Sequence, residues 1–136
     1  MPTQIIVNLP VKNLDKSIAF FKALGFKVNS QFTDQTAACM VISDDIYAML
    51  LTHAKFKEFT SKAVADARKT TEVLIAISVD SKAKVKKMVE KAVAAGGKEP
   101  REPQDHGFMI HRAFEDLDGH IWEVLWMDPN AIKKSN

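Results

Sequence analysis

The sequence predicts an α+β fold of tandem βαβββ repeats, which form a cupped, mostly antiparallel sheet with helices on the outer face. The first observation behind this prediction is a repeated spacing: Ile6 lies five residues before Val11, and Leu74 lies five residues before Val79. The second is that each valine precedes a helix-like segment that ends at a glycine. The third is that a turn with aspartate leads into an apolar strand near the end of each half.

The first half contains all the elements of one repeat. The β-branched and apolar run "QIIVNLPV" (4–11) predicts a strand. Asn13 is a suitable N-cap for a helix whose apolar residues recur at helical spacing and which ends at Gly25. Three short strand candidates follow, separated by the polar turns "TDQT" and "SDD", at 27–33, 36–43 and 45–53.

The second half repeats this order after a charged segment, 54–70, that predicts a short helix and a loop. "EVLIAISV" (72–79) predicts a strand, and "SKAKVKKMVEKAVAAGG" (81–97) predicts an amphipathic helix. A loop with two prolines then leads into two strands hinged at Asp118 and Gly119, a dipeptide typical of hairpins. We expect one domain, 1–136, with repeat one at about 4–53, a connecting segment at about 54–71 and repeat two at about 72–128.

Composition sets mild limits on the function. The 136 residues are 46% hydrophobic and 26% charged, which is ordinary for a globular domain. A net charge of +2 is too small to indicate a nucleic-acid partner. The single cysteine, Cys39, excludes an intramolecular disulfide and fits a reducing compartment. Without a signal-peptide pattern or an apolar run of roughly 20 residues, we expect a cytoplasmic protein with no membrane partner.

The alternation of side chains assigns the two faces of the opening strands. One face of each strand is apolar and suited to packing on a helix, and it carries Val7, Leu9 and Val11 in the first half and Ile75, Ile77 and Val79 in the second. The opposite face is smaller and mildly polar, and it carries Ile6, Asn8 and Pro10, and Leu74, Ala76 and Ser78. This second face either lines a cavity or faces solvent.

Glu123 interrupts the apolar run "IWEVLWM" near the end of the chain. An ionised carboxylate in such a run needs a cation or several donors, or else exposure to water. One interpretation pairs Glu123 with His111 or Arg112, or with a hydroxyl such as that of Tyr47. A sharper interpretation makes Glu123 a catalytic base that takes a proton next to a carbonyl group.

Two stretches, "LPVKNLDKSIAFFKALGF" and "DLDGHIWEV", occur here in that order and within the repeat. Together they resemble the vicinal oxygen chelate superfamily, which includes glyoxalases, bleomycin-resistance proteins, fosfomycin-modifying enzymes and extradiol dioxygenases. The resemblance covers about Gln4 to Asp128 and is closest to glyoxalase-like sequences described as predicted lactoylglutathione lyases. It implies a tandem βαβββ fold that cups around a site, often in a homodimer.

The resemblance also implies where a divalent metal would bind, because each half of a metal-dependent member supplies two ligands. The opening-strand positions are Ile6 and Leu74 here, and the closing position of the first half falls within Ala48 to Leu50, where no oxygen or nitrogen ligand stands. Only the fourth position, Glu123, matches. Since a divalent cation needs about three or more donors from the protein, the sequence predicts no metal cofactor at this position.

Two hypotheses for the function follow. In the first, the protein binds a small organic molecule in the cup without a metal, and the predicted ligand-binding residues are Ile6, Asn8, Leu50, Leu74, Met109 and His111, with Glu123. In the second, it is an isomerase or lyase that acts on a small carbonyl compound. Glu123 is then the base, or a residual ligand of a metal held by a rearranged set that includes His106 or His111. The first hypothesis is favoured, because three of the four metal-ligand positions are apolar.

Overall fold

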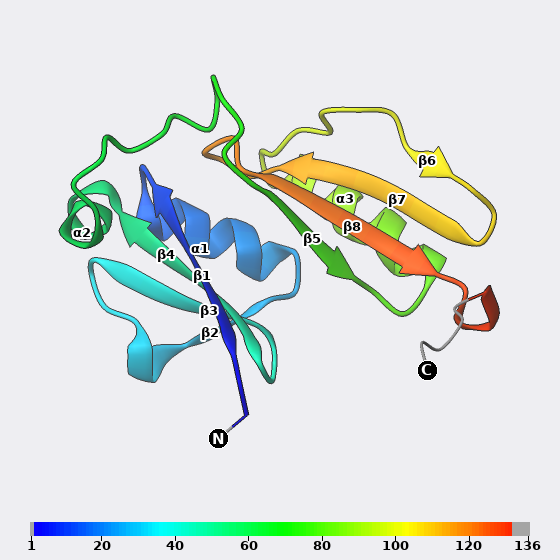
Figure 1. Cartoon of the computed structure of the whole chain (residues 1–136), viewed down its shortest axis with the longest axis horizontal. Helices are drawn as coiled ribbons and strands as arrows, with labels where there is room; N and C mark the ends of the chain where they lie inside the picture. Colours follow the sequence, from blue (N-terminus) through cyan, green and yellow to red (C-terminus); the bar gives the residue numbers. More distant parts are fainter. Residues whose placement is uncertain (1, 132–136) are drawn as a thin grey trace. The chain divides into compact units, whose positions relative to one another are not determined.

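The computed structural model describes residues 2–131, which divide into two compact units at the boundary between Asp66 and Ala67. The boundary lies inside the connecting segment that we expected at 54–71. Each unit holds one four-stranded sheet and one long helix (Figure 1). The prediction of tandem βαβββ repeats in an α+β fold is therefore confirmed, whereas the prediction of a single domain stays a prediction.

The first unit follows the expected order of elements. Its elements are β1 (Ile5–Val11), α1 (Leu14–Ala23), β2 (Lys27–Asn29), the 3-10 turn η1 (Ser30–Phe32), β3 (Ala37–Ser43) and β4 (Ile46–Thr52). The strand order is β1-β4-β3-β2, in which β1 and β4 are parallel and the other neighbours are antiparallel. The strand candidate 27–33 is shorter than predicted, because its second half turns into η1.

The helix α1 begins and ends as the sequence indicated. The side chain of Asn13 accepts a hydrogen bond from the backbone N–H of Lys16 at 3.1 Å, which satisfies one of the free donors of the first turn. Gly25 follows the helix with a φ of +103°, a conformation that few residues other than glycine adopt. Phe20 and Phe21 are buried, and their rings meet edge to face at 5.0 Å between centroids.

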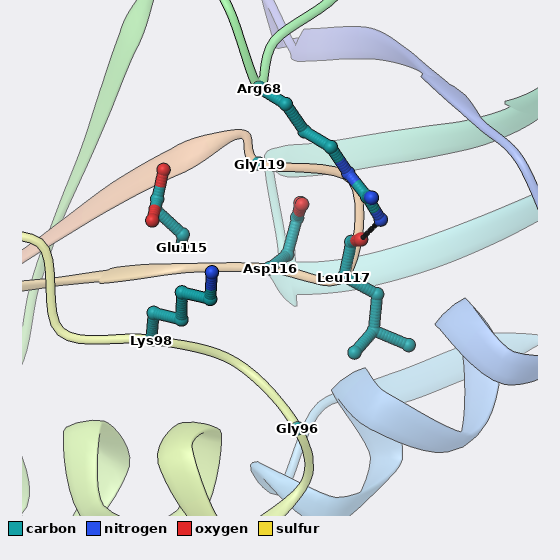
Figure 2. A pocket seen from close by; sticks show the side chains of 7 residues that line it. All are labelled: Arg68, Gly96, Lys98, Glu115, Asp116, Leu117 and Gly119. Atoms are coloured by element: carbon teal, nitrogen blue, oxygen red, sulfur yellow. Dashed lines mark hydrogen bonds between the residues drawn. The ribbon is translucent and has the colours of Figure 1, made fainter.

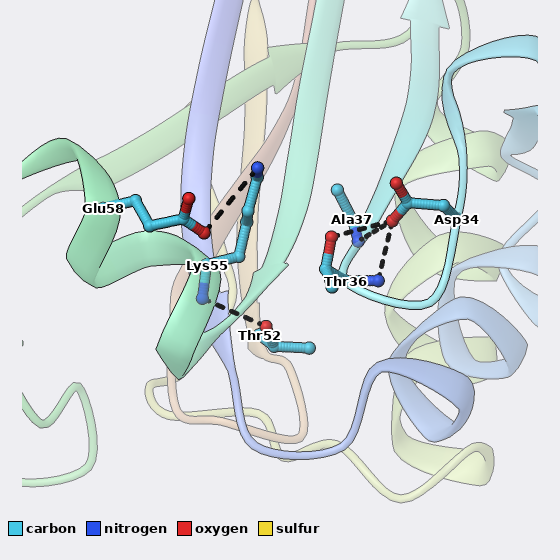
Figure 3. Close-up of polar contacts among 6 residues, drawn as sticks. All are labelled: Asp34, Thr36, Ala37, Thr52, Lys55 and Glu58. Carbon is cyan, nitrogen blue, oxygen red and sulfur yellow. Dashed lines mark hydrogen bonds and ion pairs between the residues drawn. The ribbon is translucent and has the colours of Figure 1, made fainter.

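Two short polar segments complete the first unit (Figure 3). Before β3, the carboxylate of Asp34 accepts hydrogen bonds from the backbone N–H groups of Thr36 and Ala37 and from the Thr36 hydroxyl, at 2.7, 3.1 and 2.8 Å. After β4, the short helix α2 (His53–Phe56) and the 3-10 turn η2 (Lys57–Phe59) form the predicted short helix of the connecting segment. The hydroxyl of Thr52 caps α2 by accepting from the backbone N–H of Lys55.

The second unit repeats the topology of the first. Its elements are β5 (Leu74–Ser78), α3 (Lys82–Ala94), β6 (Gln104–Asp105), β7 (Met109–Glu115), β8 (Ile121–Met127) and the 3-10 turn η3 (Pro129–Ala131). The strand order is β5-β8-β7-β6, and only β5 and β8 are parallel. The sequence did not predict β6, which is a two-residue strand inside the proline-containing loop.

The core of the second unit lies between α3 and one face of its sheet. Phe114 and Trp122 are fully buried and stack at 6.3 Å between ring centroids, and Val85 and Val89 of α3 are fully buried as well. In the turn between β7 and β8, the buried Asp116 carboxylate accepts from the Trp122 indole N–H and from two backbone N–H groups, each at 3.0 Å. Burial raises the pKa of this carboxyl group.

The described part of the chain contains no helix that is both long enough and apolar enough to span a membrane.

Candidate functional site

The sheet of the second unit has one face turned away from α3, which we call the open face. Registry and the alternation of side chains place on it Leu74, Ala76 and Ser78 from β5, Ile121, Glu123, Leu125 and Met127 from β8, and Met109, His111, Ala113 and Glu115 from β7. The other face carries the buried Phe114, Trp122 and Val124. Figure 1 shows α3 on one side of this sheet, and the strand register places Glu123 on the opposite side.

Glu123 is held by two side chains on this face. Its Oε2 atom accepts a hydrogen bond from Nη2 of Arg101 at 2.9 Å, and it lies 3.0 Å from Nε2 of His111. The side chain of Glu123 is 17% exposed and that of His111 is 18% exposed. The partner that we expected in His111 is thus present, and a guanidinium group adds the positive charge that a half-buried carboxylate needs.

Arg101 contacts both His111 and Glu123, so the three side chains form one cluster. The same Nη2 atom that binds Glu123 lies 3.1 Å from Nδ1 of His111. The same atom lies 3.2 Å from Nε2 of this ring, so Arg101 faces both ring nitrogens of His111. The second terminal nitrogen of Arg101, Nη1, is buried and has no hydrogen-bond partner among the described residues. We call Arg101, His111 and Glu123 the anchor cluster.

Arg112 and Tyr47, which we also considered as partners of Glu123, bind elsewhere. Arg112 stands opposite Val124 in the β7–β8 register, so its side chain leaves the sheet on the face covered by α3. There it forms two hydrogen bonds of 2.9 Å with the two carboxylate oxygens of Glu99, which raises the pKa of the guanidinium group. The hydroxyl of Tyr47 donates to the backbone carbonyl of Asp44.

Three of the predicted ligand-binding residues lie on the open face of the second unit. Leu74 at the start of β5 is 54% exposed, Met109 at the start of β7 is half-buried, and His111 belongs to the anchor cluster. His106, considered for a rearranged metal site, is exposed and has a backbone hydrogen bond to Met109. It is not part of the anchor cluster.

The other three predicted ligand-binding residues lie in the first unit and divide between two faces. Ile6 is 52% exposed and shares one face of β1 with the exposed Asn8. Leu50 stands beside Leu9 in the parallel register and is fully buried with it. This placement corrects the choice of Leu50, which is a core residue. In the range Ala48 to Leu50, the residue that shares a face with Ile6 and Asn8 is Met49, which pairs with Asn8.

The positions at which the resemblance implies metal ligands do not suit a metal. In the first unit they are Ile6 and Met49, a hydrocarbon and a weakly binding thioether, and in the second unit Leu74 is a hydrocarbon. Glu123 is the only carboxylate, and Arg101 already compensates its charge at a distance at which a cation would be repelled. Within residues 2–131, no three His, Cys, Asp or Glu side chains gather as a ligand group.

A hollow lies at the turn between β7 and β8 (Figure 2). Its volume is about 300 Å³, and it is lined by Arg68, Gly96, Lys98, Glu115, Asp116, Leu117 and Gly119. Arg68 closes one side by donating from Nη2 to the backbone carbonyl of Leu117 at 2.7 Å. The charged groups around it have both signs and do not converge on one point in the view of Figure 2, so we assign no ligand to it.

Sequence reasoning missed Arg101, which supplies the positive charge of the anchor cluster. The residue lies in the loop "EPREPQD", directly after Pro100 and two residues before Pro103. A lone cation inside a stiffened loop was the available signal. Its partner lies 22 residues away on β8, and only the folded loop brings the two together.

Comparisons with known proteins agree on the family. The model of the Glyoxalase/Bleomycin resistance protein/Dioxygenase superfamily matches residues 4–124. A hypothetical protein from S. aureus has a similar structure, with a TM-score of 0.78 and 30% identity over 93% of this chain and 94% of that one.

Two more distant structures share the fold. A glyoxalase-related enzyme from Fulvimarina pelagi has a TM-score of 0.77 and 21% identity, over 93% of this chain and 88% of that one. The fosfomycin resistance protein FosX from Listeria monocytogenes has a TM-score of 0.66 and 18% identity, over 99% and 95%. None of the curated proteins matches the chain.

Proposed function

The chain belongs to the Glyoxalase/Bleomycin resistance protein/Dioxygenase superfamily, and on this basis we propose that it binds a small organic molecule without a metal. The proposed binding surface in the second unit is the open face around the anchor cluster. Ile6 and Asn8 present a corresponding exposed face in the first unit.

One observation carries the proposal: the charge of Glu123 is met by Arg101 of the same chain, and its Oε2 atom also contacts His111. A carboxylate compensated in this way has no need of a divalent cation. It becomes a polar anchor beside exposed apolar groups such as Leu74. Apolar surface with a few placed polar groups is the usual composition of a small-molecule site.

The names of the superfamily and of one matched structure support the same class of function. The family name refers to bleomycin resistance, and FosX is named a fosfomycin resistance protein. These names describe the relatives. For this chain they favour a small-molecule ligand over a macromolecular one.

Elemental analysis of the purified, untagged protein is the first test. We expect nickel, zinc, manganese and iron each to be far below one ion per chain, both as purified and after incubation with each ion followed by dialysis. A stoichiometric metal that is lost in the Glu123→Gln variant would overturn the proposal. The same result in Glu99→Gln, which changes a carboxylate on the other face, would instead indicate an unrelated site.

A second candidate function is an isomerase or lyase reaction on a small carbonyl compound. The observation that favours it is the 3.0 Å contact between His111 and Glu123, since such a pair can move a proton. Arg101 weakens this candidate, because its hydrogen bond occupies Oε2, the Glu123 oxygen that contacts His111. Turnover of a carbonyl substrate that disappears in Glu123→Gln, with the fold retained by circular dichroism, would favour it.

The family resemblance also leads us to propose a homodimer. Analytical ultracentrifugation at several protein concentrations tests this, and a monomer at all concentrations would contradict it.

A further inference from the structure

Two Arg–Glu pairs of the second unit differ in geometry. Arg112 and Glu99 form a closed pair, in which two guanidinium nitrogens each bind one of the two carboxylate oxygens. Arg101 and Glu123 meet through one nitrogen and one oxygen. The closed pair has satisfied both oxygens, whereas the pair on the open face has hydrogen-bonding capacity left over.

In the described part of the chain, the anchor cluster has an unused nitrogen, Nη1 of Arg101, and an unused oxygen, Oε1 of Glu123. The contacts within the cluster are made by Nη2 of Arg101 and Oε2 of Glu123, which bind each other and both contact the ring of His111. Nη1 of Arg101 is buried without a partner among residues 2–131, and a guanidinium N–H left unbonded in that way is costly. Within the same residues, the contacts of Glu123 fall on Oε2, so that Oε1 is an acceptor available to a ligand.

We infer that the molecule bound at the open face is a neutral compound with an N–H next to a carbonyl oxygen, such as a lactam, an imide or a urea. Its carbonyl oxygen accepts from Arg101, and its N–H donates to Oε1 of Glu123. This inference rests on the proposed function and adds the chemical class of the ligand.

The charges of the cluster select against ions. The guanidinium of Arg101 and the carboxylate of Glu123 carry opposite charges and lie 2.9 Å apart. An organic anion would be attracted by Arg101 and repelled by Glu123 at nearly the same distance. An organic cation would be attracted by Glu123 and repelled by Arg101. A neutral ligand with one acceptor and one donor gains both hydrogen bonds without this opposition.

Binding also requires Arg101 to move. Nη1 is enclosed, although the side chain as a whole is 32% exposed. A ligand oxygen therefore reaches Nη1 only when the side chain, or the loop that carries it, shifts. The contact with Glu123 is a single hydrogen bond, which makes this shift easier than the opening of a closed pair.

The test compares three five-membered ring compounds by NMR. The probes are 2-pyrrolidinone, γ-butyrolactone, which keeps the carbonyl but lacks the N–H, and N-methylpyrrolidinone, in which a methyl group blocks it. Acetate and methylammonium serve as charged probes. We expect 2-pyrrolidinone to shift the resonances of Arg101, His111 and Glu123, and to bind about tenfold more tightly than the lactone, as the loss of one hydrogen bond to a charged group predicts.

Variants separate the cluster from the rest of the surface. Glu123→Ala should remove the preference for the lactam over the lactone, because the N–H that distinguishes them loses its acceptor. Arg101→Ala should weaken the binding of both, because both probes keep the carbonyl. Arg112→Ala, which opens the closed pair on the other face, should leave both affinities unchanged. Equal binding of lactam and lactone, or tighter binding of acetate or methylammonium, would overturn the inference but leave the proposed function intact. If no probe shifts any residue of the open face, and a wider set of small organic fragments also fails, the proposed function is wrong as well.

Discussion

Oε2 of Glu123 lies 2.9 Å from Nη2 of Arg101, which stands 22 residues earlier in the chain. The contact explains how a carboxylate persists between Trp122 and Val124, both fully buried on the other face of β8. It also places a positive charge beside the one family ligand position that this chain retains.

Replacing Arg101 by alanine should lower the free energy of unfolding by about 1–2 kcal/mol, because the variant leaves a half-buried carboxylate with only His111 beside it. Urea denaturation at neutral pH measures the change. The loss should be smaller when Glu123 is already glutamine, since no charge is then left uncompensated. An equal loss in both backgrounds would show that Arg101 stabilises the fold through its loop and not through Glu123.

Replacing Asp116 by alanine should cost about 2–3 kcal/mol, since the Trp122 indole N–H and two backbone N–H groups lose their acceptor. The pH dependence has a definite sign. Because burial raises the pKa of Asp116 in the folded state, its titration stabilises the fold most below the pKa of the unfolded carboxyl, about 3.9. The difference between wild type and variant should thus shrink as the pH rises through the folded pKa. A difference that grows instead would contradict this.

Asp34 should show the opposite dependence. Hydrogen bonds from the backbone and hydroxyl of Thr36 lower the pKa of its carboxyl group. The stability that Asp34 contributes is then present above the unfolded pKa of about 3.9 and is lost as the pH falls through the folded pKa. Thermal melting of wild type and Asp34→Asn at several pH values tests this, and the two melting temperatures should converge in acid. Thr36→Val, which removes the hydroxyl donor, should reduce the effect.

Gly119→Ala should destabilise the fold more than Gly107→Ala. Both glycines have positive φ, +88° and +79°, so each alanine has the same backbone strain of about 1 kcal/mol. A Cβ at Gly119 would also meet the backbone carbonyl of Ala67 at 3.0 Å, whereas a Cβ at Gly107 meets nothing within 4 Å. Equal losses of unfolding free energy in urea denaturation would mean that the backbone around Ala67 moves aside for the added Cβ without destabilising the fold.

The sequence determined the elements and their order, because hydrophobic periodicity and helix signals are local. Asn13 and Gly25 mark the ends of α1 as expected, and the alternation in β1 separates the buried Leu9 from the exposed Ile6. The same local logic identified Glu123 as a residue that needs a partner. Hydrophobic periodicity did not predict the short strand β6, because two residues are too few to show a period.

Tertiary structure alone decided which side chains meet. The β7–β8 register pairs Ala113 with Glu123, so His111 shares a face with Glu123 and Arg112 does not. A shift of the register by one residue would put Arg112 on the face of Glu123 in place of His111. The burial of Leu50 depends likewise on its register with Leu9. The reach of Arg101 depends on how its loop folds back over the sheet. Such contacts join residues far apart in the chain, so no local pattern encodes them.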